Sequence, residues 1–233
     1  GRSLRLYDLV KRKLLRKCEN KTMPSIVCCL TTVGDRVFAG DSAESLLLVR
    51  YRRAENQLAV VADDSLPRMT TRCCALDYDT AAGADKFGNV FVLRAPADAA
   101  DDLGADYATG TRALWESAAG GSGGGGSAGA GASKLEPLAQ FHVGGVVTAL
   151  RRAALVAGGQ EAVLYATVTG AVGALLPFSA REDVDFFTHL EMYMRQEHTT
   201  LCGRDHTSYR SYFLPVKGVI DGELCERFGA LPP

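Results

Sequence analysis

The sequence predicts a mainly β fold built from repeated four-stranded units, followed by a small helical region. Short runs of β-branched and aliphatic residues, separated by Gly, Asp and Asn turns, recur through residues 1–178. After Phe178 the apolar residues follow a helical spacing instead. Four of the earlier runs align with one another, and they start at Ser3, Ser45, Asn89 and Ala171.

The spacing of these runs identifies the repeat. The starts lie 42, 44 and 82 residues apart, and the last spacing falls to 45 when the 37 residues of 97–133 are subtracted. A period in the low forties with several strands per unit is typical of the blades of a WD40-like β-propeller. We therefore expect residues 1–179 to form a partial propeller of about three blades.

The elements follow in chain order. Residues 4–9 and 14–18 form a hairpin in the first unit, and the second unit has strands near 26–33, 36–39, 46–51 and 58–62. The aligned run is therefore the third strand of its blade. Since Ser3 already lies on such a strand, we expect the sequence to start in mid-blade, with the other blades of the ring preceding it.

Residues 97–133 interrupt the third unit and are rich in Ala and Gly. Such a composition cannot offset its ordering entropy, so the sequence predicts a flexible insertion between two strands of one blade. The only tryptophan, Trp115, lies in it. It is either a loop residue held on the propeller surface or an anchor that faces a partner, because Trp is enriched in binding hot spots.

Residues 180–233 form the predicted C-terminal helical region. Ser179 and Glu182 have the spacing of a capping box, so a helix is expected to begin there. Asp221 is expected to cap a last short helix over 222–228. An apolar stripe of the first helix should pack on the propeller or on a partner, and it consists of Val184, Phe187, Leu190 and Met194.

The composition limits the class of partner. With 26 Lys and Arg against 27 Asp and Glu, the net charge of −1 gives no overall attraction to nucleic acid or a membrane. No apolar run is long enough for a membrane span, and no signal peptide is visible. Four of the seven cysteines form the adjacent pairs Cys28–Cys29 and Cys73–Cys74 in apolar runs, which favours reduced, buried thiols over a disulfide framework.

No motif indicates catalysis, a cofactor or a metal site. His198, Cys202 and His206 are spaced by four residues, but a zinc site would need a fourth ligand from elsewhere. Cys202 with His206 has the residue types of a thiol dyad without an oxyanion hole or a cleft. A buried pair of Arg204 and Asp205 that holds the loop in place is the simpler interpretation.

Two basic clusters stand out against the neutral average. Arg50, Arg52 and Arg53 surround Tyr51, and a second cluster lies at residues 11–17 of the opening hairpin. Both are either solvated blade edges or contacts for an acidic partner or an RNA backbone. The candidate partner-interface residues are Arg50, Tyr51, Arg52, Arg53, Trp115, Arg204, His206, Tyr209 and Arg210.

Several segments carry a family resemblance that covers nearly the whole chain. They lie at residues 14–21, 49–58, 76–89, 201–206 and 219–226. They resemble the splicing factor 3b branch of a propeller family that also includes a damaged-DNA-binding adaptor of a ubiquitin ligase and a cleavage and polyadenylation subunit. Residues 220–222 are similar in more than one branch, whereas 202–206 resemble the splicing branch.

The resemblance implies a large protein of three propellers and a C-terminal helical domain. Such a subunit is a non-catalytic scaffold of the splicing factor 3b complex, in the U2 small nuclear ribonucleoprotein of the nucleus. It implies protein partners, namely a helical-repeat subunit and small subunits, and mostly indirect contact with RNA. The alternative is a propeller adaptor of a cullin ubiquitin ligase or of a cleavage and polyadenylation complex.

Overall fold

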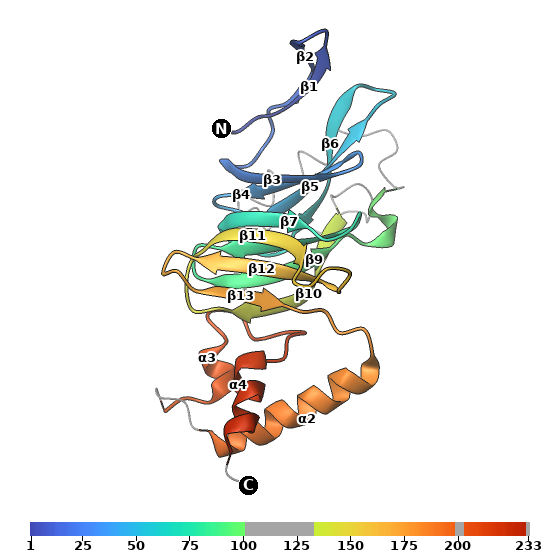
Figure 1. Cartoon of the computed structure of the whole chain (residues 1–233). Coiled ribbons are helices and arrows are strands. Elements are labelled where there is room, and N and C mark those ends of the chain that lie inside the picture. Colours follow the sequence, from blue (N-terminus) through green and yellow to red (C-terminus); the bar gives the residue numbers. More distant parts are fainter. Residues whose placement is uncertain (101–132, 199–202, 232–233) are drawn as a thin grey trace.

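The computed structural model describes residues 1–100, 133–198 and 203–231, and its fold is mainly β, as predicted (Figure 1). The strands are β1 (Leu4–Val10), β2 (Lys13–Asn20), β3 (Val27–Val33), β4 (Arg36–Asp41), β5 (Leu46–Arg52), β6 (Gln57–Asp64), β7 (Thr70–Ala75), β8 (Thr80–Asp85), β9 (Asn89–Arg94), β10 (Ser133–His142), β11 (Val147–Ala154), β12 (Glu161–Thr167) and β13 (Val172–Leu175). The helical elements are η1 (Ala97–Ala100), α2 (Arg181–Glu197), α3 (His206–Tyr209), α4 (Gly222–Glu226) and η2 (Arg227–Ala230).

The strands form propeller-like units in chain order. β3 to β6 are blade 1, β7 to β10 are blade 2, and β11 to β13 are blade 3, each antiparallel within itself. β1 and β2 pair as a separate opening hairpin. The aligned runs supply β5, β9 and β13, each the third strand of its blade, so the predicted repeat is confirmed.

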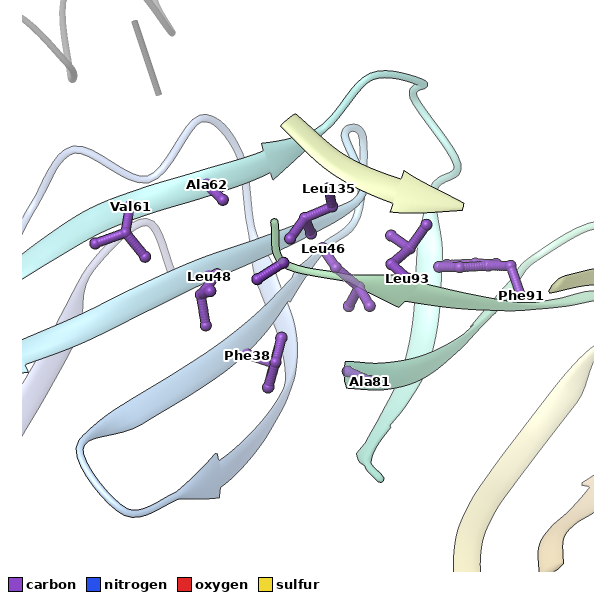
Figure 2. Packing of buried hydrophobic residues seen from close by; sticks show 10 residues of the cluster. Phe38, Leu46, Leu48, Val61, Ala62, Ala81, Phe91, Leu93 and Leu135 are labelled. Atoms are coloured by element: carbon purple, nitrogen blue, oxygen red, sulfur yellow. The ribbon is translucent and has the colours of Figure 1, made fainter. Parts of the chain in front are cut away.

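Alternation along the strands divides the core between neighbouring blades. Leu46 and Leu48 of β5 face blade 2 and contact a cluster that includes Phe91 and Leu135 (Figure 2). Leu47 and Val49, which point to the other face of the same strand, belong to the cluster under the opening hairpin. A third cluster joins blades 2 and 3. Each fully buried Leu or Phe contributes about 1.5–3 kcal/mol, so the blades are held together by side-chain burial between sheets.

The turns before the aligned strands have a buried aspartate. Asp41 and Asp85 are both 0% exposed. The Asp41 carboxylate accepts hydrogen bonds from the backbone N–H groups of Ala43 and Glu44, and Asp85 accepts them from Phe87 and Asn89. The repeated Asp therefore fixes the turn that leads into the third strand.

The cysteine pairs differ from the prediction in their burial. The described cysteines are free thiols, but Cys28 is exposed, and Cys29, Cys73 and Cys74 are only half-buried. They lie on β3 and β7, the first strands of their blades, which contact one another across the blade boundary. Cys73 packs against the cluster between blades 1 and 2, and Cys74 packs against the cluster between blades 2 and 3. Because β3 and β7 are the two end strands of the eight-stranded sheet, these side chains keep part of their surface exposed.

The C-terminal helices lie against one end of blades 2 and 3 (Figure 1). The predicted first helix exists as α2, but the capping box is wrong, because Ala180 is the N-cap and no side chain bonds there. Its apolar stripe is unevenly covered: Met194 is fully buried, whereas Val184 is 37% exposed. α4 packs on α2, with Leu224 and Cys225 buried between them.

Residues 101–132 of the predicted insertion, including Trp115, lie outside the described residues. Its two ends both lie at β6: η1 contacts this strand, and Ser133 to Leu135 of β10 pair with it in parallel. Within the described ranges, no helix has the length and apolar character needed to cross a membrane. β13 ends at Leu175 and α2 begins at Arg181, and a domain boundary between residues 179 and 180 stays a prediction.

Candidate interaction surfaces

The first predicted surface lies at the β5–β6 edge of blade 1, where Arg50 forms an ion pair with Asp35. Its Nε lies 3.0 Å from Oδ2 of Asp35, and the hydroxyl of Tyr78 donates to the other carboxylate oxygen at 2.6 Å. The Tyr78 hydrogen bond and the Arg50 charge lower the pKa of Asp35. The guanidinium of Arg36 lies 4.1 Å from the Tyr78 ring centroid. Arg50 thus belongs to a network that links blade 1 to the β7–β8 turn.

The neighbouring residues of this edge have unequal roles. The hydroxyl of Tyr51 donates to Asn56 Oδ1 at 3.0 Å, and its ring packs on the cluster under the opening hairpin. Arg52 pairs with Glu55 at 3.3 Å. Arg53 is exposed and has no ion pair within the described part of the chain. A shallow depression runs along residues 50–55 and Asp35, and Arg53 is the member best placed to meet a partner.

The second predicted surface is organised by a carboxylate that the sequence suggested only as a helix cap. Asp221 is 2% exposed and accepts hydrogen bonds from the backbone N–H groups of Glu223 and Leu224, which begin α4. Its Oδ2 also lies 2.5 Å from Nε2 of His206 and 2.6 Å from Nε of Arg210. We call this group of Asp221, His206 and Arg210 the tail latch.

Charge and burial oppose each other in the tail latch. Burial alone would raise the pKa of Asp221, but the hydrogen bonds and charges of Arg210 and His206 outweigh it, and the pKa is lowered. Burial likewise opposes the charge of Arg210, yet its bonds to Asp221 and Glu223 leave its pKa raised. Both groups are therefore charged at neutral pH, and neither can lose its partner without leaving a buried charge.

The tail latch connects the helices to blade 2. The carbonyl of Arg210 accepts a hydrogen bond from the His142 backbone N–H at 3.0 Å, and its guanidinium lies 5.0 Å from the Phe141 ring centroid. The ring of Tyr212 stacks on His142 at 5.5 Å and on Phe87 at 5.6 Å. His206 and Arg210 therefore have a role within the chain, and their contact with a partner stays a prediction.

The buried pair of Arg204 and Asp205 is not present, because both residues are exposed. Asp205 instead caps α3 by accepting from the Thr207 N–H, and it pairs with Arg195 of α2 at 3.0 Å. Tyr209 is 47% exposed. Cys202 lies outside the described residues, and among those that are described, no three His, Cys, Asp or Glu side chains are grouped as metal ligands.

The family model of the CPSF A subunit region matches residues 1–230. The chain belongs to this family. It is 50% identical over 233 residues to splicing factor 3B subunit 3 from Danio rerio and 50% identical over 232 residues to spliceosome-associated protein 130 A from Arabidopsis thaliana. It is 47% identical over 233 residues to pre-mRNA-splicing factor RSE1 from Mycosarcoma maydis. Each match covers 100% of this chain and 18% of the relative, so the chain spans less than a fifth of their length.

Two motifs of this CPSF A chain gain a physical meaning from the tail latch. Residues 220–222 supply the central carboxylate and the first residue of α4, and residues 202–206 supply His206. Arg210 lies four residues beyond His206, one turn further along the same segment, so both side chains reach Asp221. Periodicity could not identify the latch, since its members come from segments separated by a loop.

Proposed function

We propose that this CPSF A chain is part of a non-catalytic protein-interaction scaffold of the splicing factor 3b complex, in the U2 small nuclear ribonucleoprotein of the nucleus. It supports branch-site recognition in pre-mRNA splicing. The observation that carries the proposal is an identity of about 50% over the whole chain to relatives named as splicing factor and spliceosome-associated proteins. The partners are a helical-repeat subunit and small subunits of that complex, and contact with RNA is mostly indirect.

The arrangement of polar groups supports a scaffold. The buried charges of the tail latch hold helices to blade 2. The buried Arg36 and the half-buried pair of Arg50 and Asp35 join turns of neighbouring blades. Exposed residues remain at the blade edge and on the tail, notably Arg53 and Tyr209. A rigid frame with separate exposed faces suits simultaneous binding of several proteins.

Co-purification tests the proposal. The tagged full-length protein from nuclear extract should retain the helical-repeat splicing subunit and U2 RNA. The double variant Arg204→Glu/Tyr209→Ala should lose at least one protein subunit, because it reverses a charge and removes an exposed ring on the tail. The matched control is Arg181→Glu/Tyr193→Ala, which makes the same changes on exposed positions of α2.

The outcome also separates the alternatives. Recovery of a cullin without splicing proteins would assign the chain to a ubiquitin-ligase adaptor, and recovery of cleavage and polyadenylation factors would assign it to that complex. Either result would overturn the splicing proposal. Equal loss of subunits from this variant and its α2 control would show that Arg204 and Tyr209 have no specific part in the interface.

A further inference from the structure

The turn between β1 and β2 has a conformation that its residues do not favour. Lys11 and Arg12 have φ values of 47° and 66°, and they form the two-residue connection of the opening hairpin. Two successive positive φ values define a type I′ turn, which strongly prefers Asn-Gly or Asp-Gly. Turn geometry therefore does not explain why two long basic side chains occupy these positions.

This turn lies beside the basic edge of blade 1. The side-chain amide of Asn56, in the β5–β6 turn, donates to the Lys17 carbonyl at 2.9 Å. Cys18 of β2 and Tyr51 of β5 pack against the same apolar cluster. Figure 1 shows the opening hairpin and the β5–β6 connection at the same end of the molecule. The two basic clusters seen in the sequence thus form one surface.

Four side chains on this surface carry uncompensated charge. Arg16, Lys17 and Arg52 each have an acidic partner at 3.3 Å. No such partner is found in the described part of the chain for the remaining basic residues, all of them exposed. These are Lys11, Arg12, Lys13 and Arg53, which we call the basic ridge.

The basic ridge is a local departure from the charge of the chain. Residues 1–21 contain eight of the 26 basic residues and only two of the 27 acidic ones, although the whole chain has a net charge of −1. A concentration of positive charge at a protruding tip attracts polyanions from a distance, and this attraction is screened by salt.

We propose that the basic ridge binds the phosphate backbone of single-stranded RNA without reading its sequence. A phosphate backbone presents charges at regular intervals along a flexible strand, and cationic side chains that point outward from a turn can follow it without a shaped pocket. The half-buried Tyr51 is poorly placed to stack on bases, because its ring packs against the apolar cluster under the opening hairpin and its hydroxyl is bound to Asn56. The choice of RNA over other polyanions rests on the proposed function in splicing.

The turn geometry allows a variant that removes charge without harming the fold. Lys11→Asn/Arg12→Gly/Lys13→Gln deletes three charges and installs the Asn-Gly pair that a type I′ turn prefers. The matched control, Arg151→Gln/Arg181→Gln/Arg227→Gln, deletes three charges from exposed positions of blade 3 and the tail. Both are made in the full-length protein, and fluorescence anisotropy measures binding to a labelled 20-nucleotide oligouridylate from 50 to 200 mM KCl.

The ridge variant should bind the oligouridylate more weakly at low salt. The logarithm of the association constant falls linearly with the logarithm of the salt concentration, and loss of three phosphate contacts makes this negative slope shallower by about two. The fall in affinity from 50 to 200 mM KCl therefore becomes about 20-fold smaller. The control should keep the slope of the unaltered protein. The same slope in the ridge variant as in the unaltered protein would overturn the proposal.

A second probe separates RNA from an acidic protein. If the ridge variant lost affinity for a 20-residue polyglutamate but not for oligouridylate, the surface would be a site for acidic protein segments and the RNA proposal would be wrong. The splicing proposal is tested by co-purification of protein subunits and U2 RNA, whereas the RNA-binding proposal is tested by the oligonucleotide titration. Either proposal can therefore fail without the other.

Discussion

Asp221 and Asp205 make a matched pair that tests how much burial matters for the tail. Each is the N-cap of a short helix, each accepts from backbone N–H groups, and each pairs with an arginine. They differ in environment: the side chain of Asp221 is 2% exposed and that of Asp205 is 53% exposed. Their alanine variants should therefore have very different costs.

The structure gives the magnitudes. Asp221→Ala leaves the Arg210 charge buried without its main partner, which costs about 3–5 kcal/mol, and it removes a cap worth about 1 kcal/mol. Because these two effects overlap, we expect Asp221→Ala to lower the free energy of opening the tail by about 4 kcal/mol. Asp205→Ala removes a helix cap and a solvent-screened ion pair, and we expect it to lower the same free energy by about 1 kcal/mol.

Hydrogen exchange in the full-length protein measures both. The amides of Leu224 and Cys225 in α4 should exchange about 1000-fold faster in Asp221→Ala, and the amides of α3 about fivefold faster in Asp205→Ala. Since the pKa of Asp221 is lowered by folding, its contribution is complete above the unfolded value near 4 and is lost as pH falls through the folded value. Protection of α4, corrected for intrinsic rates, should be constant from pH 5 to 7 and fall below about pH 4. Equal effects of the two substitutions would refute this reasoning.

Three further predictions concern the propeller core. Arg68 is 1% exposed, its Nε lies 2.6 Å from Oδ2 of Asp64, and its guanidinium lies 4.5 Å from the Phe91 ring centroid. Arg68→Ala should therefore lower the free energy of opening the contact between blades 1 and 2 by about 3–5 kcal/mol, measured by hydrogen exchange of the β9 amides. A loss below about 1 kcal/mol would contradict this prediction. A methyl group on Gly83 would lie 2.5 Å from the Phe91 ring, so Gly83→Ala should destabilise the same contact by about 1–3 kcal/mol, and unchanged protection of β9 would argue against the packing described. Cys28 is exposed as a residue, but its Sγ lies 2.8 Å from the Thr70 carbonyl oxygen, and partial desolvation of the thiol raises its pKa to about 11. Iodoacetamide at pH 7.5 should therefore alkylate it about 20-fold more slowly than an unperturbed exposed thiol, as followed by mass spectrometry, and an equal rate would refute the pKa argument.

The blades were predictable because local patterns determine them. Period-2 alternation and polar turns set each strand, and the repeat placed β5, β9 and β13 at the same position of their blades. The parallel pairing of Ser133 to Leu135 with β6 was not predictable, because it joins residues 71 apart and neither segment has a local signal for its partner.

The tail was only partly predictable. Asp221 was identified as a cap from its position before a short helix, but its ion pairs depend on a loop that has no period. The capping box failed since Ala180, not Ser179, is the extended residue before α2. Asp205 was assigned to its neighbour in sequence, whereas the fold brings Arg195 to it from the preceding helix.

The arrangement of η1 and the start of β10 has a consequence for how this protein can change in length. Both ends of the interruption in blade 2 lie against β6, so the chain leaves and re-enters the fold at one place. Adding residues between two such adjacent ends costs little entropy, only about 0.6 kcal/mol for each doubling of the length of a flexible connection. The contacts of η1 and β10 with β6 hold these two ends in place. A folded reporter domain inserted between residues 100 and 133 should therefore leave the pairing of β6 with β10 and of β10 with β9 unchanged, and the same geometry gives this position freedom to accumulate new sequence.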